Sequence, residues 1–328
     1  MEWIPGAISN LSKLYPLLLA GFLVLTLMAH AWLFKRKTRQ YRSDYHRMKA
    51  QEKESRVVLQ HRNQLRDRTR HYEQSLTYAL RIQTAMFLTP KQLRTLFPES
   101  FIYHRPKDIV SGDFNWARRM NGKILFSVAD CTGHGVPGAF MSLLGLEFFR
   151  QITVGQGIID PAGILNEMNS QFDIVLGNTE ELSLKDGIDL AICAYDYKTH
   201  TLEYAGAFNS LYIARDHEIL EIKGDRIIVG PDYGLQRGKF ENRTLKIEEN
   251  DMLYMFTDGY ADQFGGPEGK KFKYRRFRHL LMSIHQLSVE DQLLKLEDNM
   301  NEWMGEREDQ IDDQTIIGIR PTSFSSSG

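Results

Sequence analysis

The segment DIVSGDFNWARRMNGKILFSVADCTGHGVPGAFMSLLG, residues 108–145, contains the pattern that decides the fold. Its centre is Asn121-Gly122, a dipeptide typical of a two-residue type I′ turn, because both central residues of that turn need φ > 0. We therefore predict a β-hairpin in which Met120 pairs with Lys123. A β-bulge in either strand would break this register.

The register has a chemical consequence at the open end of the hairpin, where it places Asp113 directly opposite Asp130. Carboxylates that face each other across two strands repel by up to about 1 kcal/mol, and a multivalent cation between them would remove the repulsion. The glycine-flanked turn 132–135 then leads to an apolar helix from about Gly138, whose positive N-terminus favours anions such as phosphate. The plainer alternative is a strand-end aspartate followed by an ordinary glycine turn.

Two later segments repeat this arrangement of acidic residues at strand ends. Asp258 follows the apolar strand predicted at 251–257, and Asp312-Asp313 precedes the strand predicted at 314–320. A single strand-end Asp usually caps a turn, but four such places without a local basic partner predict a shared pocket. Oxygen ligands alone suit Mg²⁺ or Mn²⁺ better than zinc.

Further elements follow from hydrophobic periodicity and capping signals. Asp160-Pro161 predicts the start of a helix that runs to Leu176, and Ser288 with Asp291 resembles a capping box. The other predicted helices are 138–153, 272–286 and 288–304, and the other strands are 189–196, 201–207, 211–214, 218–222 and 243–247.

The N-terminal part of the chain differs in character. Residues 16–34, PLLLAGFLVLTLMAHAWLF, carry no formal charge and are long enough to span a bilayer. A cleaved signal peptide and a buried core helix are the alternatives, but little positive charge precedes the segment and no small-residue cleavage site follows it. Because the basic run 35–39 follows at once, we expect a single span with residues 1–15 outside and everything downstream in the cytoplasm.

Residues 35–87 are predicted to form a long basic helix without Gly or Pro. From 35 to 85 there are 14 Lys and Arg against 5 Asp and Glu. A solvated face is the commoner explanation, and contact with anionic lipid is the alternative. A row of apolar residues that recurs every seven residues predicts a coiled coil and hence a homodimer. The second row that a coiled coil needs is only partly apolar. The first row is Val58, Leu65, Tyr72, Ala79 and Met86, and the second is Arg62, Thr69, Leu76 and Gln83.

Composition excludes several functional classes. The net charge of −1 over 328 residues gives no case for a nucleic-acid partner. Cys131 and Cys193 lie in apolar contexts without CxxC spacing, so we expect neither a disulfide framework nor a zinc site. Cys193 is expected to pack as a small apolar side chain.

Five motifs together resemble the SpoIIE-like branch of the PPM, or protein phosphatase 2C-type, metal-dependent serine/threonine phosphatases. They occur in the family's order, and the resemblance covers residues 80–320. It implies an α+β fold, an α/β/β/α sandwich of two antiparallel sheets flanked by helices, over residues 88–322, with a disordered tail at 323–328. The motifs are RPKDIVSGDF (105–114), ADCTGHGVPGAF (129–140), AGAFNSLYIA (205–214), FTDGYADQFGG (256–266) and DDQTIIGIR (312–320).

The resemblance implies a two-cation site of Mn²⁺ or Mg²⁺. The carboxylates of Asp113 and Asp130 correspond to ligands that bridge or flank the two ions, and the backbone carbonyl of Cys131 corresponds to a further ligand. Asp258 corresponds to a ligand of one ion, and Asp312 to a ligand of the other or of both.

Several neighbouring residues have open roles at this stage. Asp313 is the second Asp of its pair, whereas the first matches the family position. His134 is read as a turn residue or a supporting hydrogen-bond donor rather than a metal ligand. Asn209 either bonds near the site or shapes its turn, where Phe208 and Ser210 replace the Asn and Pro of many relatives. Arg118 and Arg119 are either phosphate-binding residues or ordinary surface charges.

The implied activity is hydrolysis of phosphoserine or phosphothreonine on a protein substrate by a metal-activated water, at the bacterial cytoplasmic membrane. In this family the substrate is often an antagonist of an anti-sigma factor. A membrane-anchored scaffold with a phosphatase-like, non-catalytic domain is the alternative, although all four acidic positions are retained. A nucleotidyl or cyclic-nucleotide enzyme also needs paired carboxylates on a hairpin, but it does not account for the later TDG and DDQT motifs.

Overall fold

A computed structural model of the chain describes residues 5–177, 187–231 and 238–321. The expected tail at 323–328 and the first four residues of the expected segment 1–15 lie outside these ranges. The chain divides into two compact units, Met1–Tyr72 and Glu73–Gly328, and each is considered by itself.

The first unit consists of most of the long helix α1 (Pro5–Met86), whose last turns, from Glu73, belong to the second unit. The helix expected between 35 and 87 is thus continuous with the apolar segment 16–34. Within the described ranges, α1 is the one helix that is long and apolar enough to cross a membrane. The side chains of its apolar segment are exposed, as shown by Leu17 (73%) and Phe22 (71%).

Two five-stranded antiparallel sheets form the centre of the second unit. The first sheet has the order β1 (Ser100–Arg105), β12 (Gln314–Ile319), β9 (Met252–Phe256), β6 (Leu211–Arg215) and β7 (Glu218–Ile222). The second has the order β2 (Phe114–Met120), β3 (Lys123–Cys131), β4 (Ile188–Asp196), β5 (Thr201–Ala207) and β8 (Arg243–Lys246). A short ribbon pairs β10 (Phe264–Gly265) with β11 (Lys270–Lys271).

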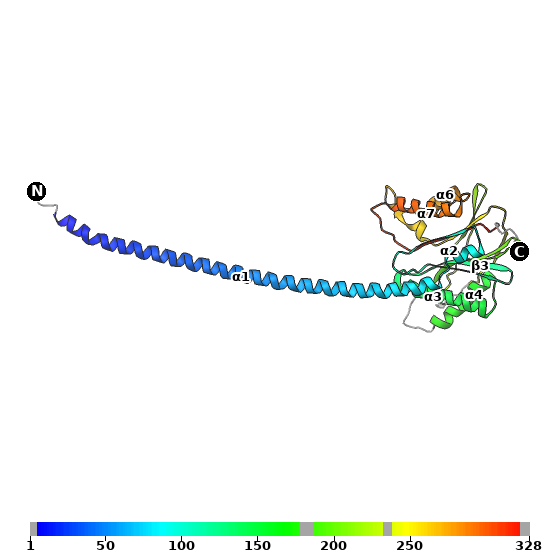
Figure 1. The fold of residues 1–328 in the computed structure, drawn as a ribbon, viewed down its shortest axis with the longest axis horizontal. Helices are drawn as coiled ribbons and strands as arrows, with labels where there is room; N and C mark the ends of the chain where they lie inside the picture. The colour runs from blue at the N-terminus through cyan, green and yellow to red at the C-terminus, as the bar shows by residue number, and fades with distance from the viewer. Residues whose placement is uncertain (1–4, 178–186, 232–237, 322–328) are drawn as a thin grey trace. The chain divides into compact units, whose positions relative to one another are not determined.

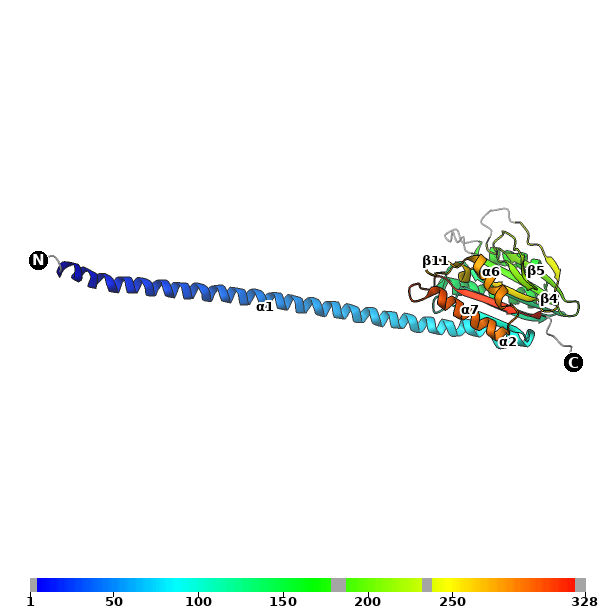
Figure 2. The same cartoon turned by 90° about the horizontal axis from the view of Figure 1, so that it is seen from above.

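Helices cover the outer face of each sheet. Figure 1 shows α6 (Lys273–Ile284) and α7 (Val289–Met304) above the sheets, with α3 (Gly135–Arg150) and α4 (Pro161–Leu176) below. Seen from above, α6 and α7 lie in front of the strands (Figure 2). The remaining helical elements are α2 (Pro90–Leu96), the π-helical turn η1 (Gln151–Gly155) and α5 (Gly259–Asp262).

Three apolar cores hold these four layers together. The core between the sheets contains Phe126, Cys193 and Ile317, all at most 1% exposed. A second core packs the β2–β5 sheet against α3 and α4, and a third packs the other sheet against α6 and α7. The second unit is therefore the predicted α/β/β/α sandwich of the α+β class, and Cys193 packs as a small apolar side chain as expected.

The hairpin forms as its sequence predicts, with φ of 48° at Asn121 and 81° at Gly122. The ladder runs from Met120↔Lys123 to Phe114↔Ala129. The predicted pairing of Asp113 with Asp130 is not part of it, because β2 begins only at Phe114. The N–H of Gly112 instead donates to Asp313 (2.7 Å), which belongs to the other sheet's chain segment.

Most other predicted element ends are correct to within two residues. The main exception is α3, which begins at Gly135 rather than Gly138, because Pro137 is tolerated in a first helical turn. The strand β1 and the helix α2 were not predicted. The signal for α2 is readable, because Thr89 and Gln92 form a reciprocal capping box at its N-terminus.

Candidate metal centre

The predicted site lies where β2 and β3 of one sheet meet β9 and β12 of the other. Asp113, 1% exposed, directly precedes β2. Its Oδ2 accepts a hydrogen bond from the Thr257 hydroxyl (2.7 Å). Thr257 Oγ1 in turn accepts from the N–H of Thr315 on β12 (3.0 Å). One threonine therefore joins the Asp113 carboxylate to the opposite sheet.

Asp258 comes directly after Thr257, so this contact also brings it to the site. The following residue, Gly259, lies against the chain before β12. A Cβ placed there would be 2.0 Å from the Asp313 carbonyl oxygen and 3.4 Å from the Asp312 Cβ. Only glycine allows this approach, which sets Asp258 and Asp312 side by side.

The adjacent residues Asp312 and Asp313 have different surroundings. Asp313 is 3% exposed, and its two oxygens accept from the backbone N–H groups of Lys107 and Gly112, both at 2.7 Å. Its carboxylate therefore holds the loop that leads to Asp113. The Asp312 carboxylate accepts from the N–H of Asp313 (2.9 Å) and interacts electrostatically with the other acidic residues.

Asp130 and Cys131 form the end of β3. Asp130 lies close to Asp258, and the two carboxyl groups interact electrostatically. The Cys131 thiol is buried in the core under α3 and α4, and burial raises its pKa well above the usual range. Its carbonyl oxygen faces the loop before Asp113, at 3.3 Å from a Cβ built on Gly112. The carbonyl, not the thiol, is thus the atom available at this edge.

The electrostatics of the cluster favour a cation. Burial raises the pKa of Asp113 and of Asp130 well above the usual range for a carboxyl. At Asp130 the neighbouring carboxylates of Asp113, Asp258 and Asp312 raise the pKa further. Burial likewise raises the pKa of Asp258 and of Asp312. The charge of Lys271 opposes this shift at Asp258, and the charge of Lys107 opposes it at Asp312.

The donor chemistry fits hard divalent cations. Mg²⁺ and Mn²⁺ prefer carboxylate, carbonyl and water oxygens, and these are the groups gathered at this edge. The carboxylates lie within electrostatic range of one another without forming a closed ligand shell. Across the described ranges, no three His, Cys, Asp or Glu side chains are already arranged around a common point.

His134 and Asn209 contact residues beside the carboxylates. His134 occupies the N-cap position of α3, and its Nδ1 lies 2.7 Å from Asp108 Oδ2. Asn209 donates from Nδ2 to the backbone carbonyl of Asp189 (3.2 Å). Both contacts shape the loops around the site, and Asn209 therefore supports the start of β4.

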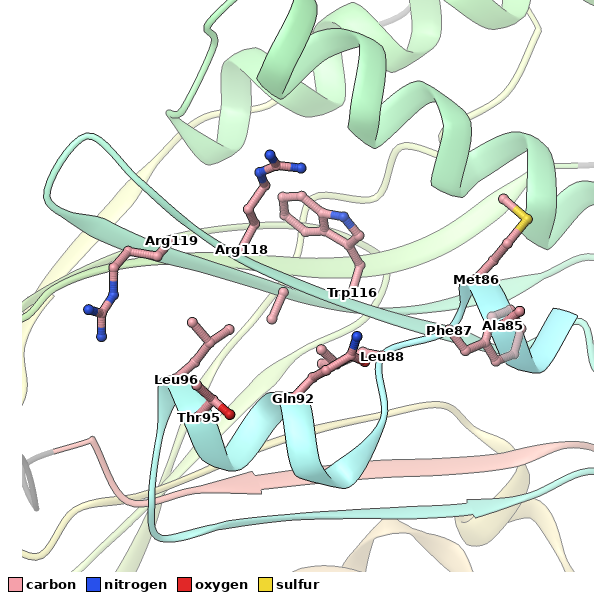
Figure 3. A pocket seen from close by; sticks show the side chains of 11 residues that line it. Ala85, Met86, Phe87, Leu88, Gln92, Thr95, Leu96, Trp116, Arg118 and Arg119 are labelled. Carbon is pink, nitrogen blue, oxygen red and sulfur yellow. The ribbon is translucent and has the colours of Figure 1, made fainter.

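Arg118 and Arg119 lie toward the hairpin turn. With α2 they line a pocket of about 420 Å³ (Figure 3). The strand rise places Arg118 about 17 Å from Asp113 along β2, and the Arg119 guanidinium lies 5.5 Å from the centre of the Tyr197 ring. This separation argues against a phosphate-binding role for either arginine at the acidic cluster.

Three residues near the site were not predicted: Asp189, Thr257 and Gln83. Asp189 is the cross-strand partner of Asp130. Gln83, 2% exposed in the last turns of α1, donates from Nε2 to the Ser111 carbonyl (2.6 Å) and to Ser142 Oγ (3.0 Å). Its Oε1 accepts from the Ser111 N–H (3.0 Å). The sequence signal for this role was the position of Gln83 in the second heptad row. A polar amide that is buried at such a position needs hydrogen-bond partners.

Comparisons with known proteins agree with this architecture. The family model for stage II sporulation protein E (SpoIIE) matches residues 120–322. The solved SiaA-PP2C domain of Pseudomonas aeruginosa is 32% identical, with a TM-score of 0.70, covering 77% of this chain and 98% of that domain. No curated protein sequence matches the chain.

More distant solved structures share the fold. A PP2C phosphatase domain with a regulatory fragment of SpoIIE from Bacillus subtilis is 17% identical (TM-score 0.54), covering 68% of this chain and 62% of that one. The RsbU and RsbW domains of a Mycobacterium tuberculosis protein are 20% identical (TM-score 0.52), covering 69% and 60%. The family model matches more than half of the residues of this chain. The chain therefore belongs to the SpoIIE family of PP2C-type phosphatase domains.

Proposed function

We propose that this protein is a metal-dependent phosphatase that hydrolyses phosphoserine or phosphothreonine on a protein partner. The observation that supports this most directly is the approach of Asp113, Asp130, Asp258 and Asp312 from four separate chain segments. Thr257 and Gly259 provide the two contacts that bring them together. The similarity to the SiaA-PP2C domain supports the same reaction class.

The residues would hold two Mg²⁺ or Mn²⁺ ions, with the Cys131 carbonyl as a further oxygen donor. Such a pair of ions, when bound, activates water near neutral pH and stabilises charge on the phosphoryl group. The contribution of the chain is positioning. Thr257 fixes one Asp113 oxygen, Asp313 fixes the loop before it, and the buried setting strengthens the attraction of the carboxylates for cations.

We further propose that α1 anchors the protein in the bacterial cytoplasmic membrane through residues 16–34, with the phosphatase domain in the cytoplasm. The segment's exposed apolar side chains and the basic run after it support a single span. Domain limits of 35–87 for the signalling helix and 88–322 for the phosphatase domain belong to the same proposal.

The long helix is also the proposed site of homodimerisation. Val58, Leu65 and Tyr72 of the heptad row are 62%, 49% and 59% exposed, so they are available to a second helix. Replacing Leu65 with Asn in the full-length protein should shift the species seen by light scattering from dimer to monomer. An unchanged molar mass would contradict this part of the proposal.

The natural substrate is proposed to be a phosphorylated signalling protein, with an antagonist of an anti-sigma factor as the favoured class. The rival function is a non-catalytic scaffold, which would bind the same partner without turnover. The two differ in one property, since only the enzyme releases phosphate.

The test uses full-length protein in detergent with Mn²⁺ and a generic phosphoester. We expect phosphate release that requires Mn²⁺ and that falls to background in Asp130→Asn and in Asp258→Asn. The matched control is Asp216→Asn, an exposed turn residue with φ of 50°, a conformation that Asn tolerates. Undiminished turnover in both site variants would falsify the catalytic assignment, and absence of turnover in the wild type would favour the scaffold.

A further inference from the structure

One carboxylate at the site belongs to none of the five family-like motifs. Asp189 lies near the start of β4, and the β3–β4 ladder pairs it with Asp130. Side chains of directly opposed residues lie on the same face of a sheet, with Cβ atoms about 4.5–5.5 Å apart. The register therefore places the Asp189 carboxylate beside Asp130, on the side where Asp258 also interacts with it electrostatically.

Within the described ranges, no hydrogen bond or ion pair joins the Asp189 carboxylate to a cationic or donor group. The Asn209 amide reaches only its backbone carbonyl (3.2 Å). Asp130 in turn faces Asp113, Asp258 and Asp312 as well. Like charges placed directly opposite each other destabilise a sheet, so an aspartate is a poor choice for a structural role at this position. A neutral residue of the same size would pack there with less repulsion.

We propose that Asp189 is an additional ligand of the divalent-cation centre, supplying a carboxylate oxygen, directly or through a bound water, to the ion held by Asp130 and Asp258. This inference rests on the proposed function and extends it. A cation at this point would convert the repulsion between β3 and β4 into a shared interaction, and it would link both strands to Asp258.

The decisive variant is Asp189→Asn, which keeps the side chain's size and removes its charge. Binding of Mn²⁺ alone to the full-length protein is measured by isothermal titration calorimetry. We expect the dissociation constant of the affected site to rise by about 10- to 100-fold, the range for losing a group that supports a metal site. The control is again Asp216→Asn, which should bind Mn²⁺ as the wild type does.

Thermal unfolding separates a ligand from a structural residue. In EDTA, Asp189→Asn should melt at a higher temperature than the wild type, because one of the opposed charges is gone. Added Mn²⁺ should then raise its melting temperature by less than it raises that of the wild type. A structural carboxylate would give the reverse, with a lower melting temperature in EDTA and an unchanged gain from Mn²⁺.

The outcomes distinguish this inference from the function on which it rests. If the wild-type protein binds no Mn²⁺, the proposed function fails and the role of Asp189 fails with it. If the wild type binds Mn²⁺ and Asp189→Asn binds it with equal affinity and an equal gain in melting temperature, Asp189 is not a ligand while the phosphatase assignment stands. A variant that fails to fold also overturns the inference, since greater stability without metal is expected.

Discussion

Asp312 and Asp313 are neighbours in the chain, yet their replacement by alanine should have opposite consequences. Asp313 accepts two backbone hydrogen bonds, from Lys107 and Gly112, and is 3% exposed. Asp312 accepts one, from Asp313 itself, and lies among other carboxylates. Asp313→Ala should therefore destabilise the fold, whereas Asp312→Ala should remove Mn²⁺-dependent phosphate release with little loss of stability.

The size of the difference follows from the number of lost bonds. A hydrogen bond to a charged group contributes about 1.5–3 kcal/mol, and a buried donor left without a partner carries the full desolvation penalty. Gly112 is buried, whereas Lys107 is only partly buried. Water can therefore replace the bond to the Lys107 N–H more easily than the bond to the Gly112 N–H. We expect Asp313→Ala to lower the free energy of unfolding by about 3–5 kcal/mol. In a domain of this size that corresponds to a drop of roughly 6–20 °C in melting temperature.

The measurement is thermal unfolding of both variants in EDTA, followed by near-ultraviolet circular dichroism, which reports the packed aromatic side chains. Asp312→Ala should melt within a few degrees of the wild type, because the loss of one hydrogen bond is offset by relief of repulsion. Equal melting temperatures for the two variants would refute the view that Asp313 anchors the loop while Asp312 serves the cation site.

Three further outcomes are expected. Gly259→Ala should abolish Mn²⁺-dependent phosphate release, because its Cβ would lie 2.0 Å from the Asp313 carbonyl, whereas Gly155→Ala, with open space around it, should leave activity unchanged in the same assay. Gln83→Leu should lower the free energy of unfolding by about 2–4 kcal/mol, measured by denaturant titration, because the buried backbone N–H and C=O of Ser111 both lose the Gln83 side-chain amide as their partner. Burial, with a smaller effect of Asp258, raises the pKa of Asp189 to about 6 from 3.8; protonation therefore favours the folded state, and in EDTA the wild-type melting temperature should fall more steeply between pH 5 and 7 than that of Asp189→Asn.

The sequence was sufficient wherever a local signal sets the geometry. Asn121-Gly122 determines the β2–β3 register because a two-residue turn leaves no freedom in the pairing, and Asp160 fixes the start of α4 through its hydrogen bond to the Gly163 N–H (2.8 Å). The acidic residues at strand ends were likewise predictable, since apolar runs mark the strands. The layer arrangement and the proposed cation ligands came from the family resemblance rather than from periodicity.

Asp189 could not be found in this way, because its position depends on a register that no turn specifies. The connection from Cys131 to Ile188 is long and contains α3 and α4. The pairing of β3 with β4 is therefore set by packing in the core and not by a tight turn. A shift of one residue would move Asp189 to the other face of the sheet. The predicted β2–β3 register is confirmed as far as Phe114↔Ala129, one residue short of Asp113 and Asp130, whose carboxylates still interact. The aspartate that pairs with Asp130 in a ladder is Asp189, on the other side of β3.

The roles of Asp312 and Asp313 show a second limit of the same origin. Consecutive residues in an extended segment point to opposite sides, so alternation predicts that the two carboxylates have different surroundings. It does not say which side faces the site. That is decided by the contact between Gly259 and the Asp313 carbonyl and by the loop that Asp313 holds, both of which involve segments from across the sandwich. The acidic motif therefore places one carboxylate among the other acidic side chains and uses the second to hold the loop that presents Asp113, and the second is as necessary to the site's geometry as the first.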